Sequence, residues 1–173
     1  MNDAARRRVV WNDVHEKAQW IDGYCYLDAR LPAVRELAAR FAKARDPNDK
    51  EGLARDFQTF VRDAITYVPD PSYEEIADSQ TILERGYGDC DDKCRLFVSL
   101  CRAVSLEARI RPVVDSDGFF YHVQSEVTWP GADRHPFAQP RGWLLVELIL
   151  RGCELGQSPA TVPASSTGSR VLE

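Results

Sequence analysis

A nine-residue stretch, GYGDCDDKC at residues 86–94, combines a glycine-rich turn with two cysteines and three acids. Asp89 is a favoured N-cap, so a helix is expected to begin here with Cys90 in its first turn. The positive end of the helix dipole and the unpaired N–H groups at that end favour a thiolate. Asp91 and Asp92 oppose that charge, so a nucleophilic Cys90 would need a histidine as its base.

Two other hypotheses explain this stretch less well. Structural zinc sites pair cysteines two to four residues apart and repeat the pair, whereas Cys25 and Cys153 each stand alone. A disulfide between Cys90 and Cys94 would join consecutive turns of one helix, where its geometry is unfavourable and its loop is tiny. Five cysteines leave at least one free thiol and argue against a secreted disulfide scaffold. A redox protein using these two thiols stays as an alternative.

The best candidate for the base is His122, one of three histidines in the chain. It lies in residues 119–129, where apolar and polar residues alternate as in a strand. His15 lies in a charged segment and His135 in a proline-flanked loop, and both are simplest as surface residues.

An acid to orient that histidine is suggested by Glu147, which interrupts the apolar stretch 143–150. A carboxylate in a buried strand is costly unless it is paired. In a neighbouring antiparallel strand, Glu147 could hold one imidazole nitrogen of His122 while the other faces Cys90. The alternative is that Glu147 points to solvent at a sheet edge.

The elements that would position these residues are helices followed by strands. On the helix that begins at Asp89, a stripe of cysteine and apolar residues is expected to be buried, with Asp91, Arg95, Ser99 and Arg102 largely opposite. Residues 143–150 are apolar enough to predict a central strand. The other expected elements are helices over 12–20, 32–45 and 51–66, and strands over 108–114 and 119–129 joined by a turn at 115–118.

The composition is that of an ordinary globular protein, with 173 residues, 44% hydrophobic and 28% charged. We expect a single domain over residues 1–155 and a disordered tail over 156–173, which is rich in Ser, Pro, Thr and Gly. A net charge of −5 without a basic block argues against nucleic-acid binding. No apolar stretch could cross a bilayer and no targeting segment is visible, so no membrane association and a cytoplasmic location are expected.

Several of these motifs, taken together, resemble the transglutaminase-like superfamily in order and spacing. The cysteine block is the most specific, the histidine block less so, and the acid block is weak by itself. The segments that carry the resemblance are Gly86–Asp92, Leu100–Val104, Ala108–Arg109, His122–Val127 and Gly142–Glu147.

The resemblance implies an α+β, papain-like fold in which N-terminal helices and a nucleophile helix pack on an antiparallel β-sheet. It also implies that Cys90 is the nucleophile, His122 the base and Glu147 the orienting acid. The family usually has Asp-Pro where this chain has Glu147-Leu148, and commonly a glycine where this chain has Ser105–Glu107. Asp-Asp after the cysteine is similar to small bacterial and phage-associated members.

The expected function is thiol acyl chemistry on a peptide, isopeptide or glutamine amide of a protein or peptide substrate, through a thioester. Hydrolysis is favoured over transamidation, because no further domain is apparent. A cross-linking transglutaminase and a non-catalytic binding module are the alternatives. No metal or organic cofactor is expected. The Cys90 N–H is the expected oxyanion donor, and candidates for a second donor are Gln80, Tyr87 and Trp143.

Overall fold

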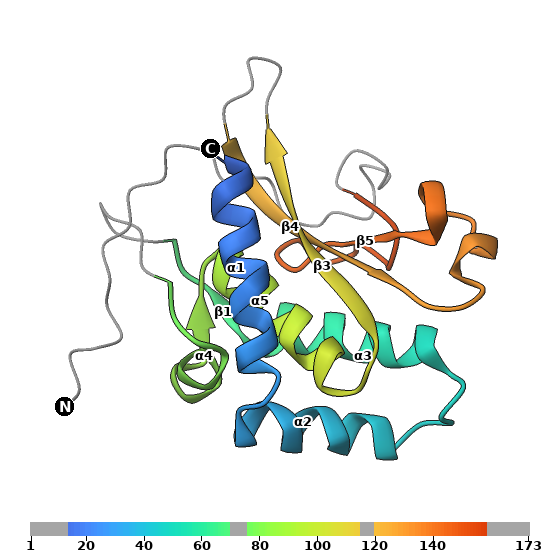
Figure 1. Ribbon diagram of the computed structural model, residues 1–173, viewed down its shortest axis with the longest axis horizontal. Coiled ribbons are helices and arrows are strands. Elements are labelled where there is room, and N and C mark those ends of the chain that lie inside the picture. The colour runs from blue at the N-terminus through green and yellow to red at the C-terminus, as the bar shows by residue number, and fades with distance from the viewer. Residues whose placement is uncertain (1–13, 70–75, 115–119, 159–173) are drawn as a thin grey trace.

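The computed structural model describes residues 14–69, 76–114 and 120–158 of the chain (Figure 1). Its helices are α1 (Val14–Asp28), α2 (Pro32–Lys43), α3 (Lys50–Ala64), α4 (Ser79–Arg85) and α5 (Cys90–Ala103), with 3-10 turns η2 (Ala132–Arg134) and η3 (Pro140–Gly142). Its strands are β1 (Thr66–Tyr67), β2 (Tyr87–Gly88), β3 (Glu107–Val114), β4 (Phe120–Thr128) and β5 (Leu144–Val146). Helices therefore precede an antiparallel sheet, and the predicted α+β class is confirmed.

The main sheet has the order β3-β4-β5, and both of its pairings are antiparallel. The prediction that residues 143–150 form a central strand is wrong: β5 has three residues and lies at the edge, whereas β4 is central. The physical reason is Glu147, whose Oε1 accepts the N–H groups of Ile149 at 2.8 Å and Leu150 at 3.1 Å. These bonds turn the chain back on itself directly after β5, so the ladder ends there.

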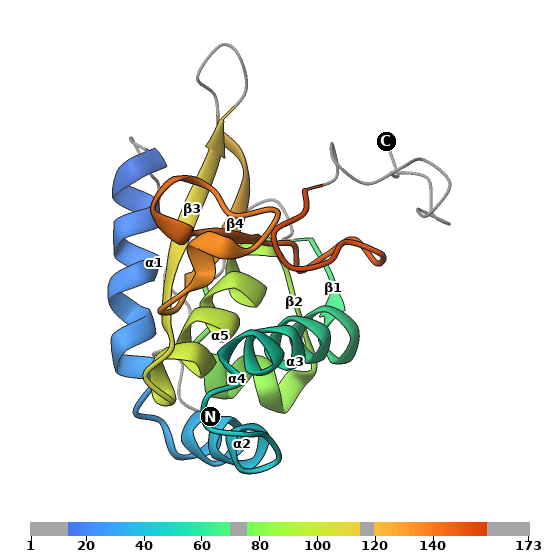
Figure 2. The same cartoon turned by 90° about the vertical axis from the view of Figure 1, so that its right-hand side faces the viewer.

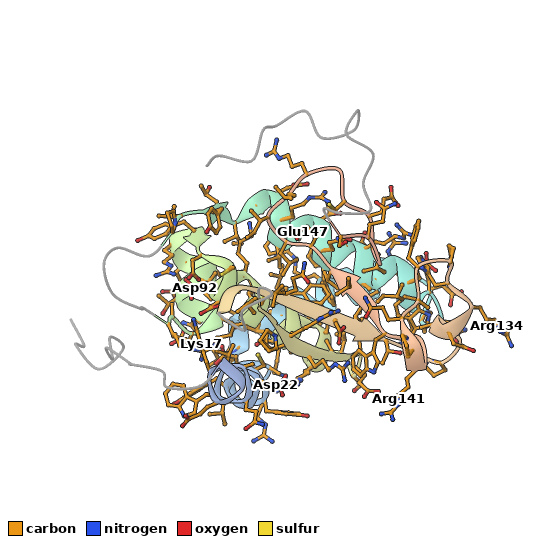
Figure 3. The ribbon with its side chains drawn as sticks, turned by 90° about the horizontal axis from the view of Figure 1, so that it is seen from above. Lys17, Asp22, Asp92, Arg134, Arg141 and Glu147 are labelled. Atoms are coloured by element: carbon orange, nitrogen blue, oxygen red, sulfur yellow. The ribbon has the colours of Figure 1, made fainter. Side chains whose placement is uncertain are left out.

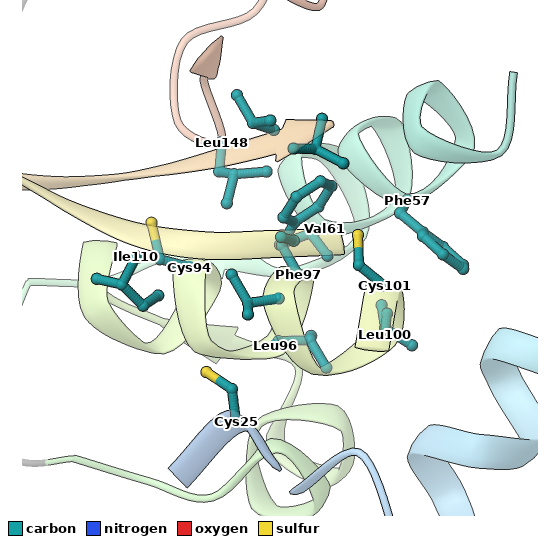
Figure 4. Close-up of a cluster of buried hydrophobic side chains, with 14 of the residues drawn as sticks. Cys25, Phe57, Val61, Cys94, Leu96, Phe97, Leu100, Cys101, Ile110 and Leu148 are labelled. Atoms are coloured by element: carbon teal, nitrogen blue, oxygen red, sulfur yellow. The ribbon is translucent and has the colours of Figure 1, made fainter. Parts of the chain in front are cut away.

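Helix α5 runs through the centre of the domain, between the other helices and the sheet (Figure 2). The middle of the predicted stripe is buried, with Cys94, Phe97 and Cys101 among core side chains (Figure 4), whereas Cys90 and Val104 at its ends are partly buried. The opposite side is buried as well. Arg95 is only 5% exposed because its guanidinium pairs with Asp28 of α1 at 2.6 and 2.9 Å. Partners from other helices thus replace water on the polar side of α5.

Both ends of α5 are capped. At its start, Asp89 accepts the N–H of Asp92 at 3.1 Å, as predicted. At its end, the N–H of Leu106 bonds to the carbonyl of Cys101 at 2.9 Å, and that of Ser105 to Arg102 at 3.1 Å. This is a Schellman cap, in which Ser105 adopts the left-handed conformation, with φ of 59°, that a glycine usually supplies.

A second, parallel pairing of β1 with β2 was not predicted, and neither was α4. The N–H of Thr66 donates to Gly86 O at 2.8 Å, and that of Val68 to Gly88 O at 3.0 Å. These bonds attach the residues before Cys90 to the end of α3. The turn before Cys90 is therefore fixed to the segment that follows α3.

The C-terminal part of the described chain packs on the sheet as far as Gly156, whose N–H donates to Leu145 O at 2.8 Å. A Cβ on Gly156 would lie 2.6 Å from that of Phe137, which shows how closely the backbone approaches. The rest of the predicted tail, from residue 159, lies outside the described residues. None of the helices in the described ranges is long and apolar enough to span a membrane.

Candidate active site

Cys90 is the first residue of α5 and is half-buried where α1, β2 and β4 meet the start of the helix. Its thiol donates to Oδ1 of Asp91 over 3.7 Å. The backbone of Val123 in β4 is also hydrogen-bonded to this sulfur. The residue predicted as nucleophile therefore lies against the central strand.

The thiol is held in its protonated form. Burial raises the pKa of Cys90 well above its ordinary value, and the carboxylates of Asp91 and Asp89 raise it further. The hydrogen bond from Val123 and the charge of Lys17 lower the pKa, but less. The start of the helix alone does not produce a thiolate here, so attack needs a base that takes the proton.

Asp91 is 1% exposed and forms a buried ion pair with Lys17 of α1. Because this pair is in direct contact with the thiol, α1 belongs to the site. Sequence reasoning did not predict a role for Lys17. No local signal pointed to Lys17, because Asp91 was expected on the polar side of the helix and its burial, which requires a cationic partner, appears only in the fold.

Asp92 is fully buried and joins three segments. Its Oδ1 accepts the N–H of Ala77 at 3.2 Å, and its Oδ2 pairs with Arg85 of α4. A Cβ on residue 88 would lie 2.6 Å from that of Asp92, so this position of the turn before Cys90 requires a glycine. The three aspartates thus serve as cap, ion-pair partner and anchor. In the described ranges, no three His, Cys, Asp or Glu side chains gather as a metal site would require.

Cys94 lies one turn below Cys90 and is 2% exposed. Its Sγ donates to the carbonyl of Val123 at 3.4 Å. Burial raises the pKa of this thiol well above its ordinary value. All five cysteines are free thiols, and the prediction that Cys94 is a core residue is confirmed.

His122 lies in β4, where its backbone pairs with that of Val113. It directly precedes Val123, whose backbone is bonded to the sulfurs of Cys90 and Cys94. The chain therefore brings the backbone at position 122 close to the start of α5. The imidazole lies outside the described residues, so its role as base stays a prediction.

His135, by contrast, is held in the loop after β4. Its Nδ1 accepts the N–H of Phe137 at 3.2 Å, and its Nε2 lies 3.8 Å from Oε1 of Glu51 at the start of α3. These contacts fix the loop on α3. They give His135 a structural role there.

Glu147 is 2% exposed, so it does not point to solvent at the sheet edge. Its Oε1 accepts the two backbone N–H groups that end β5, and its own carbonyl accepts from Gln58 Nε2 at 3.2 Å. Its charge also raises the pKa of the buried Lys93, which shows that the two side chains interact. The role of Glu147 as the orienting acid stays a prediction.

The side chains considered as second oxyanion donors lie in different environments. Gln80 Nε2 donates to Glu84 at 2.8 Å on the exposed side of α4. Trp143 lies beneath the guanidinium of Arg109 at 4.0 Å, and so faces the outer side of the sheet. Of these residues, only Tyr87 lies in the turn that leads to Cys90, in β2.

A family model described as the transglutaminase-like superfamily matches residues 35–148, which is more than half of the chain and includes Cys90, His122 and Glu147. The chain belongs to the transglutaminase-like superfamily. A comparison with curated proteins finds no match.

Two crystal structures share the fold of this transglutaminase-like chain. One, a candidate protease from Parabacteroides distasonis, has a TM-score of 0.55 and 10% identity over 76% of this chain. The other, a candidate cysteine protease from Cytophaga hutchinsonii, has a TM-score of 0.50 and 17% identity over 68%. The match spans only 30% and 38% of those two longer chains. At these identities the likeness shows the fold, which is the predicted papain-like, transglutaminase-like core.

Membership of the transglutaminase-like superfamily supports a cysteine-dependent enzyme in general terms. In Figure 3 the labelled Lys17 and Asp92 lie on the same side of the domain. The transglutaminase-like site of this chain thus has Cys90 at a helix start, two buried ion pairs around it and β4 beside it. In this arrangement the thiol of Cys90 can act on a substrate only if a nearby base accepts its proton.

Proposed function

We propose that this protein is a cysteine-dependent acyl-transfer enzyme that acts on peptide, isopeptide or glutamine amide bonds, with hydrolysis as the favoured outcome. The observation that supports it most is the half-buried thiol of Cys90 at the start of α5, bonded to the backbone of the residue that follows His122. A purely structural cysteine would have no need of this place beside a histidine-bearing strand. Its substrate is a protein or peptide.

The reaction begins with proton transfer from Cys90 to the imidazole of His122. Because the pKa of the resting thiol is raised, we expect this transfer to accompany attack rather than to precede it. Sγ attacks the amide carbonyl, and the N–H of Cys90 donates to the developing oxyanion. The imidazolium gives its proton to the leaving amine as the C–N bond breaks. Water then attacks the thioester as His122 accepts its proton, the C–S bond breaks to release the acid, and the imidazolium returns the proton to the sulfur of Cys90.

Glu147 is proposed as the group that orients His122. It is buried, and it follows Val146, which pairs with Ser125 three residues along β4 from His122. Glu is longer than the Asp that the superfamily usually has, so its carboxylate reaches further from the strand. The two N–H groups that it accepts hold this carboxylate in place.

The proposal is tested with four forms of the protein: wild type, Cys90→Ser, His122→Ala and Cys94→Ser. Each is incubated with casein, and new amino groups, released ammonia and incorporated dansylcadaverine are measured in parallel. Wild type and Cys94→Ser should turn over, whereas Cys90→Ser and His122→Ala should lose at least about a thousandfold in rate. Turnover by Cys90→Ser equal to that of wild type would contradict the proposal.

The same measurements separate the alternatives. Incorporation of the amine in excess of hydrolysis would identify a cross-linking transglutaminase. Equal losses in Cys94→Ser and Cys90→Ser would favour redox chemistry, which the buried position of Cys94 disfavours. As a core residue, Cys94 should tolerate serine at about 1–3 kcal/mol of stability.

A further inference from the structure

A groove lies at the end of α5 away from Cys90. Its first part has a volume of about 670 Å³ between α1, the end of α5 and the start of β3, and a second part of about 410 Å³ continues towards η3. Both parts are lined by Ser105, Leu106, Glu107 and Trp143, so they form one groove. We call it the basic groove. Because α5 has 14 residues, the groove is about 20 Å from the nucleophile.

Cationic side chains without a counterion surround this groove. In the ranges that the structure describes, Arg30 and Arg35 of the first part have no ion-pair partner, and the same holds for Lys50 and Arg141 of the second. Glu107 is the one acid in the lining that is likewise unpaired there. In Figure 3 Arg141 projects at the far end of the domain from Asp92. A chain with a net charge of −5 thus gathers free positive charge at one end.

The other charges of the basic groove are already neutralised. Asp22 pairs with Arg102 at 2.8 Å and accepts the N–H of Ile110 at 3.2 Å. Arg109 pairs with Glu126, whose second oxygen lies 3.0 Å from Arg111. The positive potential of the groove therefore comes from the free cations and is not cancelled by these acids.

The chemistry of the lining favours carboxylates over nucleic-acid bases. Arg102 covers the ring of Tyr26 at 3.8 Å, and Arg109 covers Trp143 at 4.0 Å. These ring faces are occupied, whereas binding of single-stranded nucleic acid depends on open aromatic faces. Free guanidinium groups can instead bind carboxylates through two parallel hydrogen bonds.

We propose that the basic groove binds an acidic segment of a polypeptide, at a site separate from Cys90. Carboxylates of the segment pair with Arg30 and Arg35 in the first part and with Lys50 and Arg141 in the second. The backbone of the segment runs over Leu106 between them. Binding needs no chemistry at the thiol, so it can be tested independently of the proposed reaction.

The test measures the fluorescence anisotropy of a fluorescein-labelled hexaglutamate peptide with the Cys90→Ser protein, at low and at physiological salt. The groove variant is Arg30→Gln/Arg35→Gln. Its matched control is Arg40→Gln/Lys43→Gln, which removes the same charge from exposed positions of α2 outside the groove. Loss of two ion pairs should weaken binding about three- to tenfold in the groove variant and less than about twofold in the control.

A second variant, Lys50→Gln/Arg141→Gln, should weaken binding of the same peptide to a similar extent, since it removes the free cations of the second part of the groove. Equal weakening by the α2 control would mean general attraction to the surface and would overturn the proposal. So would no binding at millimolar protein, or tighter binding of an oligothymidylate of the same charge. Circular dichroism of each variant verifies that the fold is retained.

Discussion

The Sγ of Cys90 lies 3.7 Å from Oδ1 of Asp91, and the same carboxylate is ion-paired with Lys17 of α1. Cys90 therefore borders a buried charge pair whose cation, Lys17, lies more than seventy residues earlier in the chain. Asp91 stabilises the protonated thiol, and Lys17 acts in the opposite sense. The balance between these two side chains sets how readily the sulfur can ionise.

Replacing Asp91 by Asn should make Cys90 more reactive near neutral pH. The change removes a carboxylate that raises the pKa of the thiol and leaves the charge of Lys17 beside it, so the pKa should fall. Each unit by which it falls increases the thiolate fraction about tenfold below that pKa. Labelling of Cys90 by limiting iodoacetamide, mapped by peptide and followed from pH 6 to 10, measures the shift. Asp133→Asn, at an exposed acid of η2, is the control and should leave the profile unchanged. A profile that moves to higher pH would refute this account.

Replacing Gly88 by Ala should destabilise the turn before Cys90. The new Cβ would lie 2.6 Å from the Cβ of Asp92 and 2.8 Å from its Oδ2, so the anchor to α4 must shift. A loss of about 1–3 kcal/mol in the free energy of unfolding is expected from such overpacking. Gly23→Ala is the matched control, since nothing lies within 4 Å of its added Cβ in α1. There alanine should stabilise by about 0.5–1 kcal/mol. Urea unfolding measures both, and a neutral Gly88→Ala would disprove the close approach.

Replacing Ser105 by Gly should stabilise the protein. Ser105 has a φ of 59° in the Schellman cap of α5, a conformation that costs an L-residue about 1–2 kcal/mol and glycine almost nothing. Part of that gain is lost to the greater freedom of glycine in the unfolded chain, which leaves up to about 1 kcal/mol. Ser105→Ala keeps the strain and should not stabilise. Thermal unfolding of both variants gives the answer, and equal effects would argue against the cap.

Replacing Lys93 by Met should change how stability depends on pH. Lys93 is 1% exposed, and burial lowers its pKa from 10.5 to about 8. Between pH 8 and 10.5 the unfolded chain binds more protons at this residue than the folded chain. The unfolding free energy of wild type should therefore rise relative to that of Lys93→Met over this range, by about 3 kcal/mol in all.

Below pH 8 the difference between the two proteins should not change with pH, because Lys93 is then protonated in both states. Urea unfolding at pH 7, 8, 9 and 10 measures the difference in unfolding free energy between the two proteins. The contribution of the buried thiols is the same in both proteins and cancels in this difference. Lys93 also donates to the carbonyls of Arg62 at 3.1 Å and Ile65 at 2.6 Å. The variant loses these bonds at every pH. This loss lowers its unfolding free energy by a constant amount and does not change how that free energy depends on pH. If the unfolding free energies of the two proteins changed in parallel over pH 8–10, the pKa of Lys93 would not be lowered in the folded protein.

Local signals in the sequence were enough to predict the helix that carries Cys90. Asp89 marks the start of α5 because its side chain can satisfy an N–H group three residues ahead. Apolar periodicity is a second local signal. It was enough to predict the β3–β4 hairpin and the helices α2 and α3. Cys94 was correctly placed in the core because it lies on the apolar side of that helix. The roles of His122 and Glu147 in the reaction stay predictions.

The sequence by itself therefore determined where Cys90 stands, since caps and periodicity act between residues a few positions apart. Only the tertiary structure decided what surrounds it. Lys17 beside Asp91, Asp28 beside Arg95, and the free cations of the basic groove come from segments that are far apart in the chain. Burial of a charge depends on whether a partner arrives from elsewhere in the fold, and no local pattern records that partner.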